Sequence, residues 1–236
     1  MPNAPFTPSP VLAFDCAGSS CSAAILVGDQ VLAQRFEARR RGQAERLLPL
    51  LQECLAEAGL SWTDLGRLAV TRGPGSFTGV RVGLATARAL ALASGLPLFA
   101  VDGFRLYAAM TTHSLPEATR RNSALVVAID ARRADLFLQC FDAQGQPLAE
   151  PQSLLPEQAA ARLPAGPLLL AGDGVEQLLP ALTGRDYQVV EGSAAADSVA
   201  LARLAANLPL PPAGSLPPTP LYLRPPDVSL PGKPRA

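Results

Sequence analysis

One order of predicted strands and turns occurs twice in this chain of 236 residues. In residues 11–37, an apolar strand ends at Asp15, a turn follows, and two further strands are joined by a hairpin. In residues 125–150 the same order returns, and its first strand ends at Asp130. Predicted helices and short apolar strands follow each copy. The repetition therefore predicts an α/β protein of two similar lobes, each with a mixed sheet flanked by helices.

The composition of the chain suggests where these parts begin and end. Residues 114–123 are polar and contain a proline, as is common where two lobes are joined. We therefore expect a loose leader at 1–10, an N-terminal lobe at 11–113, a C-terminal lobe at 114–208 and a proline-rich tail at 209–236. Within the tail, the apolar island at 220–224 is expected to dock on the body.

A glycine-rich loop separates a predicted strand at 67–71 from a long predicted helix. The loop and its flank consist of Gly73, Pro74, Gly75, Ser76, Phe77, Thr78, Gly79 and Arg81. We expect Thr78 to cap a helix from Val80 to Ser94. Such a loop can direct backbone N–H groups at an anion, but it lacks the lysine of a Walker A loop and the serine position of a nucleophile elbow. A tight connection, with glycines that permit close packing, is the alternative interpretation.

The helix that follows the loop is apolar on almost every side. Val80, Leu84 and Ala87 lie along one side, and another side carries Val82, Ala85 and Ala89. Arg81 and Arg88 are the two charged residues in it. A helix of this kind is buried on both sides, either within its own fold or against a partner. A second predicted helix, near 43–58, has an apolar face that includes Leu47, Leu48 and Leu51.

Composition excludes several chemistries. The formal net charge is zero, so no general basic field favours tight binding to nucleic acid. The single histidine, His113, rules out a histidine metal pair, and we expect it at a surface or helix end. The four cysteines lack metal-type spacing and are expected to be reduced and buried. No apolar run is long enough to span a bilayer, and we expect a cytoplasmic protein.

Residues 72–95 resemble the signature of the TsaB (YeaZ) family, bacterial proteins of tRNA threonylcarbamoyladenosine synthesis. The resemblance implies a non-catalytic relative of TsaD, the subunit that transfers the threonylcarbamoyl group to the adenosine beside the anticodon. It implies binding to TsaD, a larger complex with the ATPase TsaE, a homodimer when alone, and only indirect contact with tRNA. The implied partner interface comprises Leu47, Leu48, Leu51, Val82, Ala85 and Ala89.

The duplicated layout also resembles the actin-like, sugar-kinase and Hsp70 ATPase folds, in which ATP binds between the lobes. Asp15 and Asp130 would then flank the nucleotide, but the second hairpin lacks glycine and carries Arg132 and Arg133. We therefore expect a residual cleft without its own cofactor or metal, the ATP and metal being used by partner subunits. Gln43 stands where many family members have a histidine.

Three alternatives remain open from the sequence. Asp15 can equally be a residue that caps a turn at the end of its strand. Both aspartates could serve an ATP-dependent phosphotransferase. A peptidase is the third alternative, which the single histidine disfavours.

Overall fold

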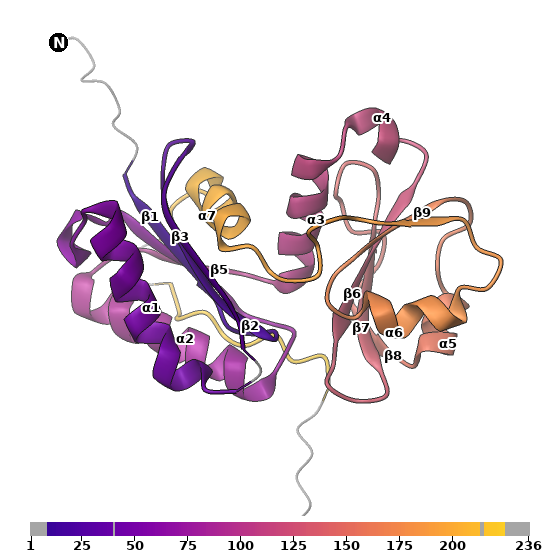
Figure 1. Ribbon diagram of the computed structural model, residues 1–236, viewed down its shortest axis with the longest axis horizontal. Coiled ribbons are helices and arrows are strands. Elements are labelled where there is room, and N and C mark those ends of the chain that lie inside the picture. The colour runs from indigo at the N-terminus through magenta and orange to yellow at the C-terminus, as the bar shows by residue number, and fades with distance from the viewer. Residues whose placement is uncertain (1–8, 40, 213–214, 225–236) are drawn as a thin grey trace, which may run out of the picture.

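The computed structural model describes residues 9–39, 41–212 and 215–224. Two five-stranded sheets lie side by side, and helices flank each of them (Figure 1). This arrangement confirms the predicted α/β class and the duplication. Most of the expected leader and residues 225–236 of the expected tail lie outside the described residues.

The first sheet has the strand order β3-β2-β1-β4-β5. Its neighbours β1, β2 and β3 are antiparallel, while β4 and β5 continue it in parallel from β1. Its elements are β1 Val11–Asp15, β2 Ser20–Val27, β3 Gln30–Ala38, α1 Gln43–Ala58, a 3-10 turn Trp62–Asp64, β4 Arg67–Thr71, α2 Phe77–Ser94 and β5 Leu98–Val101.

The second sheet repeats the plan, in the order β10-β9-β6-β7-β8. Asp15 pairs with Ser22 at the end of the first hairpin, and Asp130 pairs with Leu136 at the matching place in the second. The remaining elements are α3 Gly103–Ser114, α4 Glu117–Arg120, β6 Ala124–Asp130, β7 Leu136–Phe141, β8 Gln152–Leu154, α5 Pro156–Ala160, β9 Leu168–Ala171, α6 Val175–Leu178, a 3-10 turn Leu179–Ala181, β10 Tyr187–Val189 and α7 Ser198–Asn207.

The third strand of the second copy differs from its prediction. We expected it to start at Pro147, but β8 begins at Gln152 and an isolated bridge joins Pro147 to Phe141. Pro147 and Pro151 have no backbone N–H to donate to a ladder, so continuous pairing starts only after the second of them.

Two helices each pack on the sheet that the other half of the chain forms. α3 follows the first sheet in the sequence but packs on β6 and β9, where Phe104 and Tyr107 enter the second core. α7 follows the second sheet but packs on β1, β2 and β4, where Leu201 and Ala202 are fully buried. Figure 1 shows α7 beside the first sheet and α3 beside the second. Packing therefore crosses the predicted lobe boundary twice, although the boundary at 113/114 itself stays a prediction.

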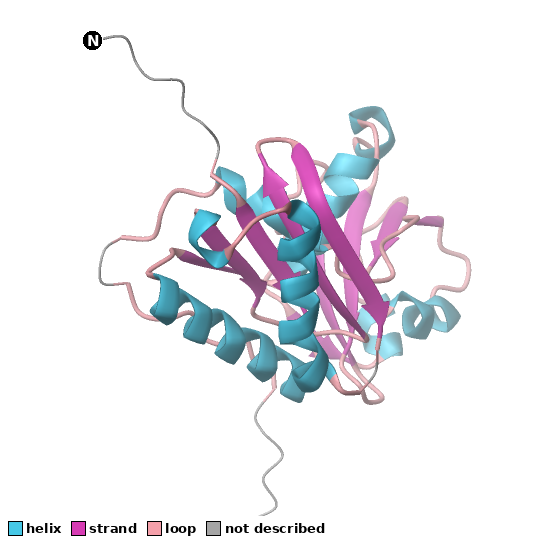
Figure 2. Ribbon diagram, turned by 60° about the vertical axis from the view of Figure 1, so that its left-hand side comes forward, coloured by secondary structure: helices cyan, strands magenta, loops and turns pink. Residues whose placement is uncertain are grey.

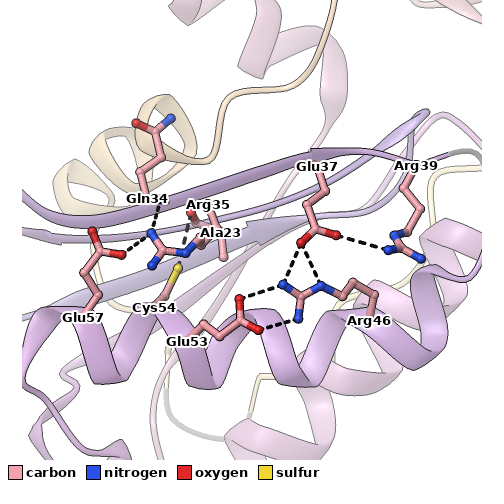
Figure 3. A network of polar contacts seen from close by, with 9 residues as sticks. All are labelled: Ala23, Gln34, Arg35, Glu37, Arg39, Arg46, Glu53, Cys54 and Glu57. Atoms are coloured by element: carbon pink, nitrogen blue, oxygen red, sulfur yellow. Dashed lines mark hydrogen bonds and ion pairs between the residues drawn. The ribbon is translucent and has the colours of Figure 1, made fainter.

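A charged network holds α1 against β3. Arg46 donates from Nε and Nη2 to Oε1 of Glu37 on β3, at 2.8 and 2.6 Å. The same guanidinium donates to both carboxylate oxygens of Glu53, one to two turns further along α1, at 2.7 and 2.6 Å. Figure 3 shows Arg46 between the two carboxylates. Figure 2 shows helices lying against the first sheet, which is nearer to the viewer there. The network links α1 to β3 at the surface, above the apolar stripe that packs in the core.

Candidate functional site: the start of α2 and the junction of the lobes

The glycine-rich loop enters α2 earlier than predicted. Ser76 is the N-cap, since its Oγ accepts a hydrogen bond from the N–H of Gly79 at 3.2 Å. The helix therefore begins at Phe77, three residues before the predicted start, and the expectation that Thr78 caps it is wrong. Ser76 keeps a non-helical backbone, which lets its hydroxyl reach the third residue of the helix.

The glycines of the loop permit contact with the first hairpin. A Cβ added to Gly79 would lie 2.1 Å from the carbonyl oxygen of Cys16, and one at Gly75 would lie 2.5 Å from that of Ala17. The N–H of Ser76 donates to the same Ala17 carbonyl at 2.7 Å. These distances favour the interpretation that the glycines serve close packing.

The side chains of α2 divide it into three sides. The core side is buried and consists of Gly79, Val80, Gly83, Leu84 and Ala87. On a second side, Arg81 and Arg88 donate to the tail, to the hydroxyl of Tyr222 and the carbonyl of Pro218. The third side, which we name the open face, consists of Thr78, Val82, Ala85 and Ala89; the first and the last two are exposed, and Val82 is half-buried.

The structure corrects part of the expected partner interface. Leu47 and Leu51 are 1% and 0% exposed, so the expectation that they face a partner is wrong. Both belong to the stripe of α1 that packs on the first sheet, together with Leu50 and Cys54. Leu48 points away from that stripe and is 44% exposed. Leu48 and the open face of α2 therefore remain available at the surface.

The apolar island at 220–224 lies against the start of α2. The N–H of Leu221 donates to the carbonyl of Arg72 at 2.8 Å, directly before the glycine-rich loop. The ring of Tyr222 stacks on that of Phe77, with centroids 5.8 Å apart. Residues 74–78, 80–81, 131–133, 137 and 221–224 line a pocket of about 560 Å³, which we name the junction pocket.

Asp15 is buried at the end of β1. Its side chain is 1% exposed, and Oδ1 accepts hydrogen bonds from the Thr71 hydroxyl and, at 3.3 Å, from the N–H of Ala17. Oδ2 has no hydrogen-bond partner among the residues that the structure describes. Burial raises the pKa of this carboxyl. This environment favours the alternative in which Asp15 closes the turn after its strand.

Asp130 lies in a separate network at the end of β6. Its Oδ1 accepts from the N–H of Arg132 at 2.6 Å and from Nε2 of Gln177 at 2.9 Å, and its Oδ2 pairs with the Arg132 guanidinium at 3.0 Å. Asp173, between β9 and α6, accepts from the N–H of Asp130 at 3.0 Å and lies 3.6 Å from Arg132. Burial raises the pKa of Asp173 to about 6.

Asp173 was not among the predicted site residues. The signal for it is the sequence Gly172-Asp173-Gly174 directly after a buried strand. A Cβ at Gly172 would lie 2.1 Å from the carbonyl oxygen of Ala128, so the turn lies tightly against β6 and brings Asp173 beside Asp130. A Cβ on Gly18, in the first hairpin, would lie 3.5 Å from Oδ2 of Asp173, so the two copies meet here.

Other chemistry-bearing side chains lie apart from this junction. His113 is exposed at the end of α3, with Nε2 3.2 Å from Arg203 of α7, as expected for a histidine at a helix end. Gln43 donates to the carbonyl of Arg39 at 2.9 Å. The four cysteines are free and buried, as expected. Within ranges 9–39, 41–212 and 215–224, no three histidine, cysteine or acidic side chains gather as metal ligands, and no helix could cross a membrane.

Comparisons with known proteins agree with this geometry. A family model described as tRNA N6-adenosine threonylcarbamoyltransferase matches residues 30–208. The tRNA threonylcarbamoyladenosine biosynthesis protein TsaB of Escherichia coli is 40% identical over 129 residues, which cover 54% of this chain and 52% of that protein. The match thus spans about half the length of this curated relative.

Solved structures extend the comparison to nearly the whole chain. A Pseudomonas aeruginosa protein, described as similar to peptidase YeaZ, superposes with a TM-score of 0.74 at 28% identity, over 92% of this chain and 100% of that one. Component A of (R)-2-hydroxyglutaryl-CoA dehydratase from Acidaminococcus fermentans shares the fold alone, with a TM-score of 0.53 at 10% identity over 84% of this chain and 97% of that one.

The duplicated sheets, the exchanged helices and the aspartate-ended hairpins define a protein of the actin-like, sugar-kinase and Hsp70 ATPase fold. The glycine-rich loop and the family match narrow this class further. The chain belongs to the tRNA N6-adenosine threonylcarbamoyltransferase family, and to its TsaB (YeaZ) members.

Proposed function

We propose that this protein is a non-catalytic subunit that binds and supports TsaD in the synthesis of threonylcarbamoyladenosine beside the anticodon of tRNA. TsaE is the further partner in the proposed complex, and a homodimer forms when TsaD is absent. On this proposal, ATP and metal are used by the partner subunits, contact with tRNA is indirect, and the complex is cytoplasmic.

The observation that carries the proposal is the open face of α2. Ala85 and Ala89 are exposed in a helix whose two arginines turn aside to the tail. Small side chains on an exposed helix let a second helix approach closely, because interaxial distance depends on the side chains at the contact. Leu48, exposed on the neighbouring α1, adds apolar area. The family relationship makes TsaD, which shares the fold, the proposed occupant of this face.

The state of the carboxylates supports a non-catalytic role. Asp15 is 1% exposed and its Oδ1 is engaged by Thr71. Asp130 and Asp173 share the guanidinium of Arg132. A phosphotransferase of this fold needs carboxylates that face the nucleotide, whereas Asp15 is buried and Asp130 and Asp173 are paired with Arg132. No observation favours the peptidase alternative for this chain.

The substitution Ala85→Glu tests the proposal. Ala85 is exposed, so the glutamate should leave the fold intact while it places a charge in the proposed helix contact. We expect copurification with TsaD to be lost and the affinity to fall by roughly 100-fold. The matched control is Ala118→Glu, an exposed helical alanine on α4 in the second lobe. Unchanged binding in an Ala85→Glu/Ala89→Glu variant that remains folded would contradict the proposal.

A further inference from the structure

Residues 218–224, which we name the C-terminal strap, contact both lobes. On the first lobe, the strap lies along α2, where the Arg88 guanidinium donates twice to the Pro218 carbonyl. In Figure 1, the tail runs in yellow from the first lobe toward the second. The chain leaves the second lobe when α7 packs on the first sheet. The strap, which follows α7, then brings the chain back to the second lobe.

The middle of the strap is held by aromatic and cationic contacts. The Arg81 guanidinium lies 3.5 Å from the centroid of the Phe77 ring and 5.9 Å from that of the Tyr222 ring. Its Nε also donates to the Tyr222 hydroxyl at 2.9 Å. Cation–π contacts and a hydrogen bond together orient all three side chains. These contacts attach the strap to the first turn of α2.

The end of the strap is anchored in the second lobe. Leu223 packs against the core that contains Phe137 and Ile129. Arg224 forms an ion pair with Asp135, at the start of β7, and its Nη2 lies 3.5 Å from Oγ of Ser153 on β8. Seven consecutive residues therefore join the glycine-rich loop of the first lobe to the second hairpin, between β6 and β7.

We propose that the C-terminal strap is a clasp that fixes the angle between the two lobes and closes one wall of the junction pocket. The exchanged helices α3 and α7 connect the lobes where they pack against each other, beside His113 and Arg203. The strap connects them at the glycine-rich loop and the second hairpin. Two connections at separate places restrict a hinge that either one alone would leave open. This inference does not depend on the proposed binding to TsaD.

The distance between the lobes in solution tests the clasp. Nitroxide labels at Gln52→Cys on α1 and Glu157→Cys on α5 occupy exposed sites, whereas the four native cysteines are buried. With the strap intact, we expect one narrow distance distribution by double electron–electron resonance. The variant Tyr222→Ala/Arg224→Ala removes the side-chain contacts of the strap with Arg81 and Asp135, and we expect its distribution to shift or to broaden by about twofold.

Two further variants separate the clasp from a general loss of charge. Asp135→Asn should broaden the distribution as Arg224→Ala does, and the two changes together should add little, because they remove one contact. The matched control Arg121→Ala breaks an exposed ion pair with Glu117 inside α4 and should leave the distribution unchanged. Strap variants that keep the wild-type distribution while folded would overturn the proposal.

A measurement on the unaltered protein tests the proposal even where the variants do not fold. The N–H of Leu221 donates to Arg72, so a docked strap should slow its hydrogen exchange by about 100-fold relative to an unstructured peptide. Exchange of Leu221 at the unstructured rate would show that the strap is undocked in solution and would also overturn the proposal.

Discussion

Gly79 shows how one residue links the first hairpin to α2. It lies in the first turn of the helix, where alanine would be the better helix former by about 1 kcal/mol. The carbonyl oxygen of Cys16 nevertheless lies 2.1 Å from the place of its missing Cβ. The clash involves backbone on both sides, so no rotation of a side chain can relieve it.

We predict that Gly79→Ala destabilises the protein by about 1–3 kcal/mol, because the hairpin or the helix must shift to admit the methyl group. Denaturant unfolding gives the change in the free energy of unfolding. Gly83→Ala is the matched control, since a Cβ there would meet the Cys16 side chain at 3.3 Å and not a carbonyl. A loss in the Gly79 variant no larger than in the control would contradict this account.

Asp173 makes stability depend on pH. Its folded-state pKa is raised from 3.8 to about 6, so the folded protein binds this proton more tightly than the unfolded chain does. The resulting stabilisation is complete below the unfolded value and is lost as the pH rises through 6. Between about pH 5 and pH 8, the loss amounts to about 1 kcal/mol.

We therefore predict that Asp173→Asn gains stability relative to the wild type as the pH is raised over this range. The asparagine oxygen can still accept the hydrogen bond from the Asp130 N–H. Unfolding free energies of both proteins at several pH values check the slope. An equal slope in Asp186→Asn, an exposed control in the same lobe, would show that the effect does not come from the buried position.

At the scale of elements, α2 marks the limit of what its sequence predicts. Its end at Ser94, its apolar sides and its two charges followed from composition and turn residues, whereas its start at Phe77 did not. Hydropathy alone, however, cannot distinguish an apolar side of a helix that packs in the core from one that is exposed and can bind a partner. The same limit explains why Leu47 and Leu51 were placed in the interface. Both belong to a single apolar stripe of α1, which the first sheet covers completely.

The elements around Asp15 and Asp130 show a second limit. The pattern placed both aspartates correctly at the ends of matching strands. Their chemical roles depend on side chains from distant segments, namely Thr71 for the first and Arg132 and Asp173 for the second. Such neighbours become visible only when strand order is known. The duplicated pattern therefore predicted the fold well and the chemistry of the site only in part.

At the scale of the whole molecule, the exchange of α3 and α7 joins the two sheets. Each sheet uses a helix from the other half of the chain to cover one face. Neither half can therefore bury its apolar surface alone, and loss of packing in one half exposes the other. The two lobes form one cooperative unit in spite of their separate sheets.

We predict that heat or denaturant unfolds the protein in one transition. Far-ultraviolet circular dichroism and the fluorescence of Trp62, which packs at the edge of the first core, should report the same midpoint. Two separated midpoints would contradict cooperative coupling of the lobes.

The late position of α7 also bears on synthesis of the chain at the ribosome. The strands that it covers are made first, and their faces carry Val11, Ala13 and Leu26. Until residues 198–207 leave the exit tunnel, this apolar surface of the nascent chain is uncovered and can bind chaperones or aggregate. The first sheet, which is translated before α7, thus completes its packing only after that helix has been made.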